Sequence, residues 1–143
     1  MIAVDTNLLV YAHRRDAAFH AAAAACLRGL AEGLAAWAIP WPCLFEFWNV
    51  ATHPRIFATP STPEQALAQL DAWLEAPTCH LIGDLPAQRP DLARLVAGAV
   101  RGPQVHDARI ALVCRAHGVD ELWSVDRDFS RFTWLRVRNP LAG

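Results

Sequence analysis

The chain has 143 residues, of which 54% are hydrophobic and 19% are charged, and its formal net charge is −1. This length and composition suit a single folded domain spanning residues 1–143 and exclude a disordered chain. The near-neutral charge excludes a globally basic surface for nucleic acid, so any such contact must come from a local patch.

The N-terminal segment predicts a strand followed by two helices. Residues 2–4 form a short apolar run that we expect to be a buried strand. A helix begins over residues 8–12, and the side chain of Asp5 or Thr6 can cap it. An Ala- and Leu-rich helix follows at residues 18–32 and ends at a glycine.

The middle of the chain continues the alternation of strands and helices. We expect a brief strand at residues 36–39, after which two prolines introduce a helix that runs to about residue 52. The sequence Ser-Thr-Pro-Glu at residues 61–64 is typical of a helix start, and that helix should run to about residue 75. Another short strand is expected at residues 79–82.

The C-terminal part predicts two helices and two strands. The helices span residues 91–100 and 105–117, and the strands span residues 122–125 and 135–137. Short apolar strands that alternate with helices indicate an α/β fold with a parallel sheet covered on both faces. Sites in such sheets form beyond the carboxyl ends of the strands.

Four acidic residues stand where such a site would form. Asp5 ends the first strand and Asp126 follows the strand at 122–125, so both can point into one crevice. Asp107 lies in the first turn of its helix, where the helix dipole favours an ionised carboxylate. Glu46 lies within an apolar helix, where an unpaired buried carboxylate would be costly.

Each acid also has a purely structural interpretation. Asp5 could cap a helix, Asp107 could serve only the helix dipole, Asp126 could lie in a solvated turn, and an arginine could satisfy Glu46. Together they fit a site for Mg²⁺ or Mn²⁺, because these hard cations prefer oxygen ligands. Such a cation suits phosphodiester hydrolysis.

Four segments carry a resemblance to a known family. They are residues 4–12 (VDTNLLVYA), 45–47 (FEF), 105–111 (VHDARIA) and 122–129 (LWSVDRDF), and the likeness extends to VRNPL at 137–141. In this order and at these spacings they resemble the PIN-domain family and, within it, the VapC-type toxins. That resemblance implies a three-layer α/β/α fold with a short, mostly parallel sheet.

The resemblance also implies an activity, a cofactor and partners. The activity is hydrolysis of RNA phosphodiester bonds by the toxin of a type II toxin–antitoxin pair, with Mg²⁺ as cofactor and Mn²⁺ as a substitute. The implied catalytic residues are Asp5, Glu46, Asp107 and Asp126, of which Asp5 and Asp107 bind the metal directly. The implied partners are a VapB-type antitoxin and a second copy of the chain.

Several further residues have possible auxiliary roles. Asp128 matches an additional acidic position of the family, and Thr6 and Asn7 could orient groups around the metal. Four arginines could contact RNA phosphates or could be ordinary solvated side chains; they are Arg14, Arg15, Arg109 and Arg127. Arg14 and Arg15 are expected near the mouth of the site, and His106 is expected on a different helix face from Asp107.

Two other classes of function share part of this pattern. A phosphotransfer enzyme of the haloacid-dehalogenase or receiver type needs a site lysine, and all 13 basic residues of this chain are arginines. Haloacid dehalogenases also need a second aspartate where this chain has Asn7. The second alternative is a PIN-like module that binds RNA or protein without cleavage, which the intact set of acids disfavours.

The remaining features are consistent with a cytoplasmic protein. No apolar run reaches the roughly 18 residues that a membrane span requires, and the N-terminus shows no targeting segment. The four cysteines form no CxxC pair and lie in apolar stretches, which is typical of reduced core thiols.

Overall fold

The computed structural model describes all residues of the chain, 1–143. Six α-helices are present: α1 (Thr6–His13), α2 (His20–Glu32), α3 (Trp41–Ala51), α4 (Pro63–Leu74), α5 (Arg89–Ala97) and α6 (Gln104–Ala116). Five strands are present: β1 (Ile2–Val4), β2 (Trp37–Pro40), β3 (Cys79–Ile82), β4 (Glu121–Trp123) and β5 (Val137–Arg138). Two 3₁₀ helices, η1 (Pro86–Gln88) and η2 (Arg127–Arg131), complete the set.

The five strands form one sheet in the order β3-β2-β1-β4-β5, and every neighbouring pair is parallel. The chain winds outward from β1 through β2 to β3, and then crosses back to β4 on the other side of β1. The order therefore reverses between β1 and β4. At such a switch point the loops that follow the two strands diverge and leave a crevice at the carboxyl edge of the sheet.

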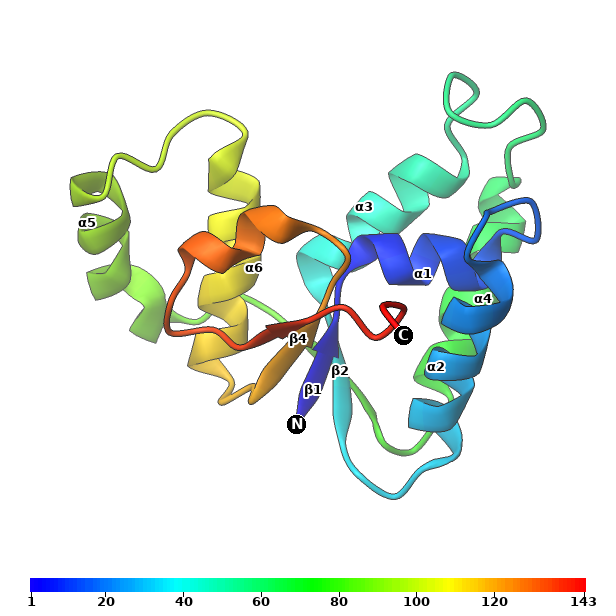
Figure 1. The fold of residues 1–143 in the computed structure, drawn as a ribbon, viewed down its shortest axis with the longest axis horizontal. Helices are drawn as coiled ribbons and strands as arrows, with labels where there is room; N and C mark the ends of the chain where they lie inside the picture. Colours follow the sequence, from blue (N-terminus) through cyan, green and yellow to red (C-terminus); the bar gives the residue numbers. More distant parts are fainter.

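Helices cover both faces of the sheet and give the three-layer α/β/α arrangement that the sequence predicts. Figure 1 shows α1, α2 and α4 on one side of the strands and α5 and α6 on the other. Helix α3 contacts α1, α4 and α6, so it joins the two layers near the carboxyl ends of the strands. None of the helices is both long enough and apolar enough to span a membrane.

The core lies where the sheet meets the helices on each face. The central strands are its most buried part: Ala3 and Val4 of β1 and Trp37 to Ile39 of β2 have no exposed surface. This agrees with the near-continuous apolar runs that a parallel sheet requires, since both of its faces are covered. All four cysteines are free thiols, two buried and two partly buried, as expected from their apolar surroundings.

Several element boundaries and caps differ from the sequence prediction. Helix α1 begins at Thr6, and neither Asp5 nor Thr6 caps it with its side chain, because both side chains face the site described below. Helix α4 does have the expected cap: Thr62 and Gln65 form a reciprocal capping box.

The C-terminal strands are shorter than predicted or shifted. The β4 ladder ends at Trp123, because the chain turns there to place the next residues over the sheet edge. The last strand begins at Val137 rather than at Leu135, which is buried in the core as part of a turn. Helix α5 begins at Arg89 and is preceded directly by η1.

Candidate active site

The predicted acidic residues lie at the carboxyl edge of the sheet, at the switch point between β1 and β4. Asp5 follows β1 directly, and its backbone N–H donates to the carbonyl of Trp123 at 2.9 Å, which extends the β1–β4 ladder by one bond. Asp126 follows β4 and is the N-cap of η2. Two segments far apart in sequence are thus held together by backbone pairing.

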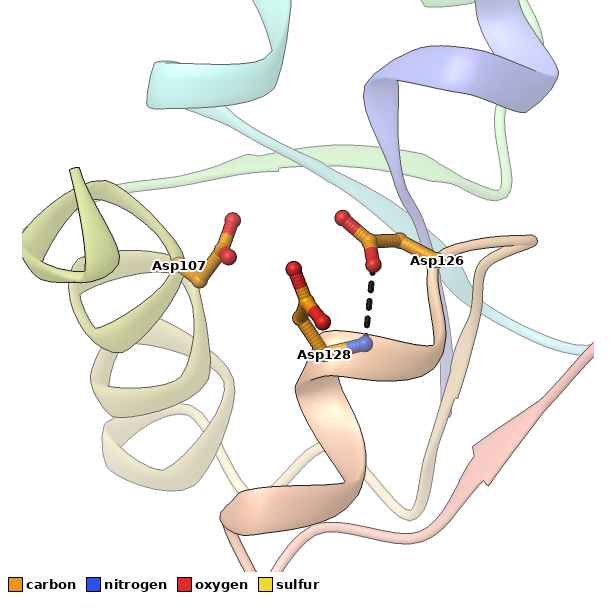
Figure 2. A group of neighbouring side chains, drawn as sticks. All are labelled: Asp107, Asp126 and Asp128. Atoms are coloured by element: carbon orange, nitrogen blue, oxygen red, sulfur yellow. Dashed lines mark hydrogen bonds between the residues drawn. The ribbon is translucent and has the colours of Figure 1, made fainter.

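Three carboxylates converge beside this edge. Figure 2 shows Asp107 on α6 pointing toward Asp126 and Asp128, which come from the start of η2. One oxygen from each of the three lies within 4.8 Å of the others. The Asp126 carboxylate accepts a hydrogen bond from the Asp128 backbone N–H at 2.8 Å, which fixes the turn and holds both side chains in place.

Asp5 is the buried member of the acidic set, with only 4% of its surface exposed. The Ser124 hydroxyl donates to Asp5 Oδ2 at 2.7 Å, and the Asp126 backbone N–H donates to the Ser124 oxygen at 3.0 Å. The only side chain that contacts Oδ1 by hydrogen bonding is the Cys43 thiol, at 3.7 Å. Ser124 therefore links the residue that follows β1 with the loop that follows β4.

Burial dominates the electrostatics of Asp5. It raises the pKa of the carboxyl to about 6, against the opposing effect of the Ser124 hydrogen bond, because a buried carboxylate loses hydration. The nearby Glu46 charge raises the pKa further. A buried acid that is costly to ionise gains from a neighbouring cation, since the cation restores the lost stabilisation.

Glu46 is exposed, contrary to the prediction that it is buried among aromatic side chains. Phe47, the next residue of α3, is buried in the core, but Phe45 and Trp48 are partly exposed beside Glu46 and do not enclose it. Its Oε2 accepts a hydrogen bond from the Thr6 hydroxyl at 3.1 Å, while no residue of the chain hydrogen-bonds to Oε1. One carboxylate oxygen of Glu46 is thus held in place, and the other is free.

A hollow of about 660 Å³ opens between α3 and the start of α6, and we call it the acid hollow. Its lining residues are Pro42, Phe45, Glu46, Asn49, Pro103, His106, Asp107, Arg109 and Ile110. Glu46 from α3 and Asp107 from α6 both line this space. His106 also lines it, contrary to the expectation that it points away from Asp107.

The charges around Asp107 favour a cation. Its pKa is raised, first by partial burial and then by the negative charges of Asp126, Asp128 and Glu46, while Arg131 opposes the shift. The chain places no salt-bridging cation against the three clustered carboxylates. An oxygen-only donor set with an excess of negative charge fits Mg²⁺ or Mn²⁺.

The arginines proposed for phosphate contact divide into two groups. Arg14 and Arg15 lie at the far end of α1, about 12 Å along the helix from Asp5, and line a separate hollow with Thr59 and Ser61. The expectation that they flank the site mouth is therefore wrong. Arg109 borders the acid hollow, but its guanidinium is paired with Asp84 at 2.7 Å.

Arg127 is the arginine best placed to meet a phosphate. It is exposed in η2, between Asp126 and Asp128, and forms no salt bridge within the chain. Asn7 is half-buried in the first turn of α1, and its side chain makes no hydrogen bond with the rest of the protein.

Ser124 is the residue that the sequence analysis missed. It lies in the segment that carried the family resemblance, two residues before Asp126, yet serine there was not singled out. The available signal was its position: a small hydroxyl residue directly after a buried strand can hydrogen-bond across to the next strand's end. Cys43, interpreted only as a core thiol, likewise contacts Asp5.

The chain matches one protein family and several full-length relatives. The family model described as "PIN domain" matches residues 2–135. Ribonuclease VapC43 of Mycobacterium tuberculosis is 37% identical over 146 residues, covering 100% of this chain and 97% of that protein. Ribonuclease VapC48 of the same organism is 32% identical over 141 residues, covering 97% of each.

Solved structures with the same fold are also found. Mycobacterium tuberculosis VapC20, a toxin that cleaves the sarcin–ricin loop, superposes with a TM-score of 0.69 at 22% identity, covering 96% of this chain and 99% of that one. The VapBC2 complex of Rickettsia felis, bound to a promoter DNA fragment, gives a TM-score of 0.66 at 20% identity over 96% of this chain and 98% of the other. At these identities the likeness establishes the shared fold.

Proposed function

Because the chain belongs to the PIN-domain family and, within it, to the VapC group, we propose that it is a divalent-cation-dependent ribonuclease that acts as a toxin. The observation that carries the proposal is the convergence of Asp107, Asp126 and Asp128, whose ligand atoms lie within 4.8 Å of one another. The relatives named as ribonucleases over the full length of the chain support RNA as the substrate.

The cation, which we propose to be Mg²⁺ with Mn²⁺ as a substitute, would be held by acidic side chains. Asp107, Asp126 and Asp128 would supply oxygen ligands from one side, and Asp5 would add Oδ1, whose only side-chain hydrogen-bond partner is the Cys43 thiol. When bound, a divalent cation lowers the pKa of water and offsets negative charge on a phosphate. Ser124 keeps Asp5 aligned with the loop that follows β4.

Glu46 and the polar residues around it would act on the attacking water. The Thr6 hydroxyl fixes Glu46 Oε2, so that Oε1 is free to accept a proton from water in the acid hollow. Asn7, with no partner of its own in the chain, would orient water or a phosphate oxygen. Arg127, exposed between the two η2 acids, would contact a neighbouring phosphate.

We propose two protein partners, in keeping with the VapC group. One is a VapB-type antitoxin that blocks the site; the solved VapBC2 complex of Rickettsia felis is a member of this fold that carries such a partner. The other is a second copy of the chain. The alternative function, an RNA- or protein-binding module without cleavage, would leave the cost of clustering three carboxylates unexplained.

A cleavage assay with matched variants tests the proposal. A fluorogenic single-stranded RNA should be cleaved in Mg²⁺ or Mn²⁺ and not in EDTA. Asp107→Asn and Asp126→Asn should each lower the rate at least about 100-fold, since each removes one charged ligand at constant size. Asp91→Asn, also a first-turn aspartate but on α5, is the control and should stay active. Metal-independent cleavage, or full activity of both site variants, would refute it.

A further inference from the structure

An aromatic ledge borders the acid hollow, and we define it as Trp41, Phe45 and Trp48 of α3. The spacings of four and three residues place all three rings on one face of the helix. All three are partly exposed, Phe45 by 56% of its surface. Exposed aromatic groups of this size in a row indicate a binding surface rather than a core.

The geometry of the ledge leaves ring faces open. The centroids of Trp41 and Phe45 are 6.2 Å apart with planes inclined at 32°, and those of Phe45 and Trp48 are 6.3 Å apart at 34°. All three side chains nevertheless keep about half of their surface exposed, so no ring is covered completely by its neighbour. Each ring therefore has surface that a flat group could cover.

Phe45 connects the ledge to the chemistry. It precedes Glu46 along α3 and lines the acid hollow together with Asp107. Asn49, one helical turn further on, lines the same hollow and offers an amide that can donate and accept hydrogen bonds. A flat, polar-edged group held on Phe45 would thus lie beside the carboxylates.

The charges near the hollow favour a nucleobase over a phosphate as the occupant of the ledge. The lining holds Glu46 and Asp107, and its one arginine, Arg109, is paired with Asp84. The whole chain has no lysine and a net charge of −1. Electrostatic attraction to the RNA backbone is therefore weak here, and base stacking supplies binding that does not depend on charge.

We propose that Phe45, supported by Trp41 and Trp48, is a positioning residue that stacks an unpaired base of the RNA next to the cleaved bond. The proposal rests on the ribonuclease function above and adds a residue of this chain that would hold the substrate, through a base that is unpaired or splayed open at the site. Bases inside an A-form helix cannot reach a side-chain ring, whereas those in loops and single strands can.

The test combines binding and cleavage. Binding of a labelled single-stranded RNA is measured in EDTA, where no cleavage interferes, and cleavage is measured in Mn²⁺. Phe45→Ala should bind about 5- to 150-fold more weakly, the range expected for loss of one stacked base. Phe45→Trp should restore binding and Phe45→Leu should not, because the contact needs a flat ring. Phe19→Ala, which removes a phenylalanine with 52% exposure away from the hollow, is the matched control.

Two further measurements separate stacking from other roles. The salt dependence of binding should have the same slope in Phe45→Ala as in the unmodified protein, whereas Arg127→Ala should reduce the slope by about one. Replacing the nucleotides that flank the mapped cleavage site by abasic ones, one at a time, should identify a position where Phe45→Ala has no additional effect.

The outcomes distinguish failure of this inference from failure of the proposed function. If the unmodified protein cleaves RNA and Phe45→Ala binds and cleaves equally well, the ledge does not position a base. If Phe45→Ala changes the molar mass in solution instead of RNA affinity, the ledge is a protein contact and the inference is overturned. If the unmodified protein neither binds nor cleaves RNA, the proposed function fails together with it.

Discussion

At the residue scale, the surroundings of Asp5 disfavour the charged form of its carboxyl group. Its pKa is raised to about 6 by burial, whereas in the unfolded chain it is near 3.8. The folded protein therefore holds this proton at pH values where the unfolded chain has lost it. Asp5 lowers the free energy of unfolding progressively as the pH rises from about 4 to 6, and by a constant amount above that range.

Asp5→Asn should remove this cost in the absence of metal. The difference in unfolding free energy between Asp5→Asn and the unmodified protein should grow in favour of the variant by about 3 kcal/mol between pH 4 and 7, and then level off. Chemical denaturation of both proteins in EDTA at several pH values measures it. A difference that stays constant with pH would mean that Asp5 ionises normally in the fold.

Asp107 has two interpretations, as an acid of the metal site and as a residue that serves only the helix dipole, and one experiment can separate them. Its pKa is raised by burial and by neighbouring carboxylates, so neutralising it should stabilise the metal-free protein. Asp107→Asn should melt higher than the unmodified protein in EDTA and gain little from Mn²⁺, because we propose that the cation binds only the folded site. Asp91→Asn, the first-turn control on α5, should melt lower, because it loses a dipole contact and the pairing with Arg94. Scanning calorimetry measures the melting temperature of all three proteins. A lower melting temperature for Asp107→Asn than for the unmodified protein would show that Asp107 is a structural helix residue.

The sequence allowed some site residues to be identified and not others, for physical reasons. Asp5 and Asp126 were predictable because strand ends in a parallel sheet meet at one edge. Ser124 was not, because its role depends on which strand lies beside β4, and hydrophobic pattern does not encode strand order. Glu46 lines the same hollow as Asp107, but its environment was predicted wrongly, since an apolar neighbourhood in sequence does not tell which helix face is covered.

At the element scale, Arg14 fastens the end of α1 to the segment between α3 and α4. Its guanidinium donates to Asp16, to the Thr59 carbonyl at 2.9 Å and to the Ser61 hydroxyl at 3.2 Å, and it lies 4.1 Å from the centre of the Phe57 ring. With these contacts the Arg14 side chain holds the two segments together, and few of its N–H donors remain for an RNA phosphate.

Arg14→Ala should therefore loosen that segment without weakening RNA binding. We expect a loss of about 1–2 kcal/mol in unfolding free energy from the hydrogen bonds and the cation–π contact, with faster proteolysis between residues 52 and 62. RNA affinity in EDTA should stay within about twofold, whereas Arg15→Ala, its exposed neighbour, should leave both properties unchanged. A drop in RNA affinity for Arg14→Ala at unchanged stability would restore the phosphate-contact interpretation.

The elements themselves were largely predictable, and their ends were not. Every strand and α-helix of the structure has a counterpart in the sequence analysis, because apolar runs, prolines and caps such as Thr62 mark them locally. The two 3₁₀ helices were missed, since η2 is set by the Asp126 side chain accepting from the Asp128 backbone, a contact within a polar turn that carries no hydrophobic period. The late start of β5 depends on pairing with β4, which is a tertiary contact.

At the scale of the whole molecule, the surface contains an apolar face apart from the aromatic ledge. Helices α5 and α6 with η1 enclose a hollow of about 530 Å³, and several of its lining residues are substantially exposed: Leu85, Leu92, Val96 and Val105. A contiguous apolar face of this kind on a small domain is typical of a surface covered by another protein. We expect this face to contact a second copy of the chain, because one apolar patch can pack against the same patch across a twofold axis.

This expectation gives the last prediction. The protein should have a molar mass of about 32 kDa by light scattering at micromolar concentration, twice the 15.8 kDa of one chain. Val96→Asp should weaken the dimer more than about tenfold, or 1.4 kcal/mol, because it places a charge in an apolar contact that would otherwise exclude water. Leu34→Asp is the matched control, since Leu34 is 99% exposed in the loop after α2 and Val96 is 75% exposed on α5. It should leave the mass unchanged. A single species of one chain for the unmodified protein would contradict the dimer, and a dimer that survives Val96→Asp would move the interface away from α5.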